Sequence, residues 1–200
     1  MVAHNPLALG LMLVGVFGLL FAAYLYRLQK NGKRTKEDKA FGAAFCLGGG
    51  LAVLFLVQLY FLEPIPGQYV EIYGVGYAMF ALAMLTAGLT ILNEWNENAA
   101  TSLASLLGVI LFAEAFNIAK FSLSKSPIAT MFLFGIPGLG ALLMPGVNLT
   151  PQRKWLLMGA MLLFLAFDAL ALYSGINAMG GHVASALEKA AAAAAAAKTA

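Results

Sequence analysis

Long apolar runs separated by short polar segments fill this chain from residue 7 to residue 175. A helix that crosses the hydrocarbon core of a bilayer needs about 20 mostly apolar residues. Six runs have about that length: 7–26, 41–62, 73–92, 102–119, 128–147 and 155–175. The pattern therefore predicts an all-α fold, a polytopic bundle of six transmembrane helices.

The segments between these runs are too short to separate two domains, so residues 1–180 are expected to form one transmembrane domain. Residues 181–200 differ, because alanine dominates them. Alanine is the strongest helix former, and this tail is expected to be helical or disordered. It is set aside from the functional interpretation.

The run 128–147 is the least regular of the six because it contains Pro137, Pro145 and several glycines. One interpretation is a kinked helix packed against its neighbours. The other is a discontinuous helix that offers backbone carbonyls to a solute path. The sequence leaves both open.

Composition indicates a membrane protein, and the distribution of charge predicts its orientation. The chain is 62% apolar and 10% charged, whereas soluble domains are about 25% charged, so a soluble globular domain is excluded. Between Arg27 and Lys39 lie 6 of the 12 basic residues. Basic residues concentrate in cytoplasmic loops, which predicts a multi-pass protein of the cytoplasmic membrane with both termini outside. The positive charge reflects this topology and indicates no nucleic-acid partner.

Two carboxylates fall inside apolar runs. Asp168 is the one charged residue between Leu156 and Gly175, and Glu114 lies in the fourth run. An acid near the bilayer centre costs roughly 2.5–3.5 kcal/mol on insertion, and such residues usually face a path or a partner. Both lie about 20 Å from the inner ends of parallel helices. We expect a shared polar environment, with Asn117 as a hydrogen-bond donor; the alternative is that each acid is protonated and only ties helices together.

The third run carries a stripe of small and weakly polar residues at helical spacing. Its members are Gly76, Met79, Ala83, Thr86, Thr90 and Asn93. Small residues are typical of close helix–helix contact, while spaced hydroxyls and amides would also line a pore for a neutral solute. Both interpretations remain open.

Several chemistries have no residues to support them. The histidines, His4 and His182, lie outside the apolar runs, and Cys46 is the single cysteine. Neither a haem pair nor a cysteine-rich metal site can be built from these residues. No metal, cofactor or catalytic residue is predicted, and an enzyme is not expected.

The layout resembles the small six-span bacterial urea channel and amide transporter family. The third run opens with Tyr73-Gly74 and closes with Asn93, as in that family, and LFAEAFN (111–117) is similar to its fourth span. LAFDALALY resembles the last-span pattern in which an acid follows Phe and faces the path. The resemblance implies that Asp168 is this acid and that the chains assemble into a homo-oligomeric ring. The outer segment EPIPGQYVEI carries no histidine, so acid gating does not carry over. The layout also fits an uncharacterised family of small six-span proteins.

These observations predict a channel or facilitator for a small polar solute such as urea, a short amide or ammonia. Path-lining or anchoring roles are expected for Asp168, Glu114, Asn117, Thr86, Thr90 and Asn93. The alternative is a non-catalytic accessory subunit of a larger membrane complex, in which the acids pair with a partner's basic residues. The expected partners are the bilayer, the solute, and either further copies of the chain or other membrane subunits.

Overall fold

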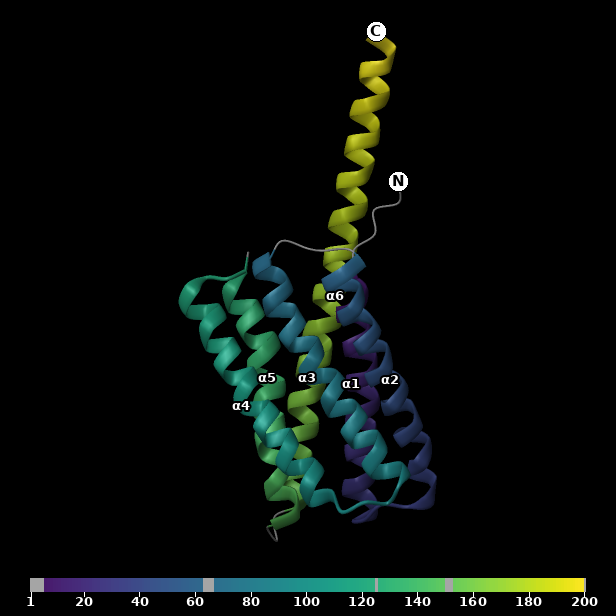
Figure 1. The fold of residues 1–200 in the computed structure, drawn as a ribbon, viewed down its shortest axis with the longest axis vertical. Helices are drawn as coiled ribbons and strands as arrows, with labels where there is room; N and C mark the ends of the chain where they lie inside the picture. The colour runs from purple at the N-terminus through teal and green to yellow at the C-terminus, as the bar shows by residue number, and fades with distance from the viewer. Residues whose placement is uncertain (1–5, 63–66, 125, 150–152, 200) are drawn as a thin grey trace.

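Every regular element in the described part of the chain is a helix. The computed structural model describes residues 6–62, 67–124, 126–149 and 153–199 (Figure 1). Its long helices are α1 Pro6–Asn31, α2 Lys39–Val57, α3 Gly67–Leu92, α4 Glu97–Phe121, α5 Pro127–Leu149 and α6 Arg153–Thr199. All 6 are long and apolar enough to cross a membrane. The predicted fold class is confirmed; His4 lies outside the described residues.

Local sequence explains where the helices begin and end. The side-chain oxygen of Asn96 accepts a hydrogen bond from the backbone N–H of Asn98 at 2.9 Å, which caps the start of α4. The same helix ends at Ser122, whose φ of 51° is in the left-handed region. A single 3₁₀ turn at Lys36–Asp38 leads into α2, and one wider π-type turn at Gln58–Leu62 follows it.

The prolines of α5 do not interrupt it. The helix is continuous from Pro127 to Leu149 with Pro137 and Pro145 in its interior. Each proline lacks an N–H, so one carbonyl in the preceding turn loses its usual helical partner. The structure therefore agrees with a packed proline-containing helix, and a discontinuous α5 is not what it shows.

The bundle is built mainly from helix pairs. The closest packing joins α1 to α6, α2 to α3 and α4 to α5, and α5 also packs on α6, whereas α3 and α4 meet only over a limited area. Glycines bring paired backbones together. A Cβ on Gly88 would lie 2.7 Å from the Gly42 carbonyl oxygen, and one on Gly108 would lie 2.8 Å from that of Gly138. These distances leave no room for a side chain, so the pairs are fixed by small residues.

The start of α1 and the end of α6 lie on the same side of the bundle (Figure 1). The helix α6 passes residue 181 without a break and projects beyond the other helices as far as Thr199. The Ala-rich tail is therefore a continuation of the last transmembrane helix, and no structural boundary marks residue 180.

Candidate functional site

A cavity of about 190 Å³ lies in the middle of the bundle, between α3 and α4. Its lining residues come from α1, α3, α4, α5 and α6 and from Arg34 in the segment before α2. It follows from the limited contact between α3 and α4, because side chains of other helices border this space without filling it. On α3 the lining extends from Tyr73 to Ile91, about 27 Å at the helical rise.

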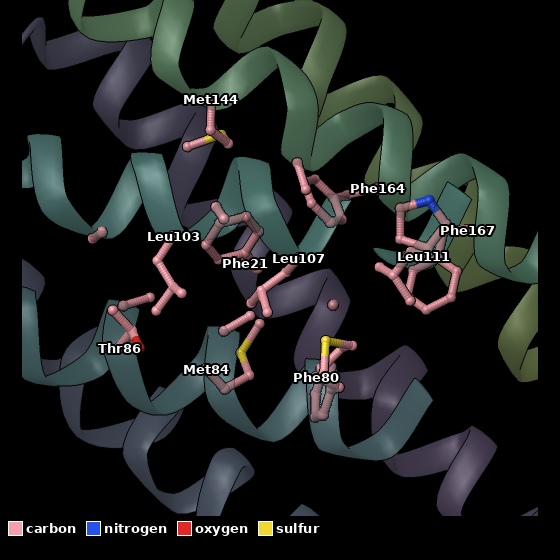
Figure 2. Close-up of a pocket in the computed structure, with 18 of the residues that line it drawn as sticks. Phe21, Phe80, Met84, Thr86, Leu103, Leu107, Leu111, Met144, Phe164 and Phe167 are labelled. Carbon is pink, nitrogen blue, oxygen red and sulfur yellow. The ribbon is translucent and has the colours of Figure 1, made fainter. Parts of the chain in front are cut away.

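Most of the lining is apolar. Figure 2 shows aromatic, leucine and methionine side chains from several helices gathered around one space. The residues labelled there are Phe21, Phe80, Met84, Thr86, Leu103, Leu107, Leu111, Met144, Phe164 and Phe167. Such a surface favours an apolar ligand, because burying apolar surface against it removes that surface from water.

The stripe predicted on the third run faces this cavity for most of its length. Gly76, Met79, Ala83, Thr86 and Thr90 belong to the lining. Asn93 does not: it is exposed at the end of α3, where its side-chain amide donates to the Leu89 carbonyl at 2.9 Å. Gly76 also receives Phe134 of α5, since a Cβ there would lie 3.0 Å from that ring. Both interpretations of the stripe therefore apply. Its Gly76 end packs against α5, and the remaining lining residues face the cavity.

One end of the cavity is polar, and Arg34 organises it. The Nε of Arg34 lies 2.7 Å from a carboxylate oxygen of Glu97, and one terminal nitrogen donates to the Thr90 carbonyl at 2.8 Å. The other donates to the Trp95 carbonyl. These contacts use three of the five guanidinium N–H groups. Arg34 thus holds the end of α3 and the start of α4 with its charge balanced by Glu97.

Two buried hydroxyls lie at the same end. Tyr24 and Thr90 are each 6% exposed and line the cavity. Neither hydroxyl has a hydrogen-bond partner among the described residues. Buried hydroxyls normally find a partner, so these two are available to a guest.

Ion pairs secure the loops around this end. Arg153 lies 3.8 Å from the second carboxylate oxygen of Glu97. The Nζ of Lys39 lies 2.8 Å from a Glu94 oxygen, and this hydrogen-bonded ammonium holds the pKa of the Glu94 carboxyl below its usual range. The pair joins the start of α2 to the turn between α3 and α4.

Asp168 lies in the interface between α1 and α6. It has no exposed surface, and neither carboxylate oxygen has a partner among the described residues. A Cβ on Gly18 of α1 would collide with this carboxylate, so the acid packs directly on the Gly18 backbone. Gly18 belongs to the cavity lining and Asp168 does not. Asp168 therefore lies behind the cavity wall, enclosed by its own chain.

The structure does not bring the predicted acids together. Glu114 is half-buried on α4, outside the described cavity lining, and the acid that acts on it electrostatically is Glu71. Asn117 is exposed on the same helix. Thus, of the six predicted site residues, Thr86 and Thr90 reach the cavity, Asp168 lies behind its wall, and the other three lie elsewhere.

Sequence reasoning missed Arg34 and Tyr24. Arg34 belongs to a basic segment that membrane topology already explains, and Tyr24 lies near a span end, where aromatic residues need no special role. Their link to Thr90 and Glu97 crosses three segments of the chain, and no local pattern signals it.

A comparison with known protein families gives one match. A family described as "Protein of unknown function (DUF981)" matches residues 1–185. The chain belongs to this family. Searches of curated proteins and of solved structures gave no match. The likeness to urea channels therefore rests on the layout alone, and the uncharacterised six-span alternative agrees with the family. The match covers the bundle and stops within the projecting part of α6.

Proposed function

We propose that this membrane protein binds a long apolar molecule inside the bilayer, in the cavity between α3 and α4. The observation that carries the proposal is the apolar lining, which extends for about 27 Å along α3. One leaflet provides only about half of the 30 Å hydrocarbon core. The lining therefore extends along α3 for more than the thickness of one leaflet.

The lining supports this function better than passage of urea or ammonia. A path for small polar solutes needs hydrogen-bonding groups spaced along it. From Ala83 to Tyr73, the α3 side of the lining consists of small, methionine and aromatic residues, and the Tyr77 hydroxyl already donates to the Leu7 carbonyl at 3.3 Å. Thr86 and Thr90 are confined to the end of the lining near Ile91.

Filling the cavity provides the test. Ala104 of α4 lines the cavity, whereas Ala113 of the same helix is exposed outside it. We expect Ala104→Phe to abolish binding of a long isoprenoid alcohol and Ala113→Phe to leave it unchanged. Binding is measured by native mass spectrometry and by the rise in unfolding temperature of the detergent-purified protein.

Equal binding by both variants, or none by the parent protein, would contradict the proposal. Urea uptake by proteoliposomes, followed by stopped-flow light scattering, tests the earlier channel hypothesis in parallel. Fast uptake that Ala104→Phe slows and Ala113→Phe does not would return the preference to a solute path.

A further inference from the structure

The polar end of the cavity restricts the charge of the head group that the ligand can carry. Among the described lining residues, the ionised side chains are Arg34 and Glu97, which pair with each other at 2.7 Å. An anionic head would face the Glu97 carboxylate, and a cationic head would face the Arg34 guanidinium. Within the lining the charges of Arg34 and Glu97 cancel, and Arg153, which lies 3.8 Å from Glu97, is outside the described lining, so an uncharged head meets no unpaired charge there.

The remaining polar groups at this end can all donate a hydrogen bond. Arg34 keeps two N–H groups after its three contacts with Glu97, Thr90 and Trp95. The buried hydroxyls of Tyr24 and Thr90 have no partner among the described residues. A head with carbonyl oxygens can accept from all three side chains, whereas a head with only donors could bond to the two hydroxyl oxygens and not to Arg34.

The guanidinium is held in place before any guest arrives. Its three contacts join a carbonyl near the end of α3 and one in the following turn to a carboxylate at the start of α4. A donor fixed in this way loses little rotamer freedom on binding. The Tyr24 ring and the nearby Phe21 ring, whose centroids are 6.4 Å apart with their planes inclined at 40°, add apolar surface beside the head.

We propose that the ligand is an uncharged amphiphile with a carbonyl-bearing head and an apolar chain that follows the lining along α3, the chemistry of an isoprenoid quinone. The head accepts hydrogen bonds from Tyr24, Thr90 and Arg34 at the polar end of the cavity, and the chain extends along α3 toward Tyr73. This inference rests on the proposed function and specifies the ligand class of the same cavity.

The experiment compares three probes of matched chain length on the detergent-purified full-length protein: an isoprenoid quinone, the corresponding isoprenoid hydrocarbon and a polyprenyl phosphate. We expect the quinone to bind most tightly. Tyr24→Phe keeps the ring and removes one donor, so it should weaken quinone binding roughly three- to tenfold and leave hydrocarbon binding unchanged. Tyr26→Phe is the matched control, because Tyr26 is exposed on the outer face of α1.

A second pair of variants separates binding from folding. Arg34→Gln should lower quinone affinity without changing hydrocarbon affinity, and Lys33→Gln, an exposed neighbour on the same segment, should change neither. If the phosphate binds more tightly than the quinone, or if Tyr24→Phe and Arg34→Gln leave quinone affinity intact, the inference fails while the proposed function stands. If none of the long probes binds, both fail.

Discussion

Asp168 shows how much a single residue's meaning depends on its neighbours. An isolated ionised carboxylate in an apolar interior is strongly disfavoured, so the enclosed site favours the neutral acid. The carboxyl packs on Gly18 of α1, the residue that separates it from the cavity. At the residue scale, Asp168 therefore acts with Gly18 to set the spacing of α1 and α6.

This contact gives a prediction on stability. Gly18→Ala should destabilise the protein by roughly 1–3 kcal/mol, because the new methyl group collides with the Asp168 carboxylate. Gly50→Ala in α2 is the control: a Cβ there has no atom within 4 Å, and alanine is the better helix former. Thermal unfolding in detergent measures both.

A double-mutant cycle identifies the partner. Adding Asp168→Ala to Gly18→Ala should recover much of the loss, since it removes the colliding group. A double variant no more stable than the sum of the two single changes would show that the collision lies elsewhere.

At the scale of elements, the helices are set by their ends and by their glycine contacts. Ser122 ends α4 in a left-handed conformation that L-residues adopt at a cost and glycine adopts freely. The pairs α2–α3 and α4–α5 meet through glycines on both partners. Three closely packed pairs and a loosely packed α3–α4 contact leave the cavity in its observed place.

The end of α4 gives a second prediction, in which one substitution has opposite signs at two positions. Ser122→Gly should stabilise the protein by roughly 1 kcal/mol, because it relieves the left-handed backbone strain. Ser102→Gly, at an exposed position inside α4, should destabilise it by a few tenths to about 1 kcal/mol. Chemical denaturation in mixed micelles would show the two midpoints moving apart; shifts in the same direction would refute this account of the cap.

At the scale of the whole molecule, six helices place the start of α1 and the end of α6 on one side and the basic segment Arg27–Lys39 on the other. The charge distribution predicts that the basic side is cytoplasmic. The polar end of the cavity, with Arg34 and Glu97, would then open toward the inner leaflet, and the projecting part of α6 would extend outside the cell.

Cysteine labelling in intact cells tests this orientation. In a Cys46→Ala background, a membrane-impermeant maleimide should label Glu188→Cys in intact cells and Lys33→Cys only after lysis, since both positions are exposed. The reverse pattern would invert the topology and move the polar end of the cavity to the outer leaflet.

The sequence determined the fold class, the number of spans and their approximate bounds. The reason is that apolar length and charge segregation are local properties of the chain, and a bilayer imposes one strict length on every spanning helix. It also placed Thr86 and Thr90 on one helical face, because the spacing of residues on a helix is fixed.

Only the tertiary structure decided where those faces point. Asp168 and Glu114 lie at similar depth on parallel helices, yet one is enclosed against Gly18 and the other is half-buried on α4. Depth follows from counting residues along one helix, whereas neighbours follow from the rotation and pairing of helices, which close glycine contacts between distant segments fix. For the same reason, the meeting of Tyr24, Arg34 and Thr90 at one end of a cavity was decided by packing alone.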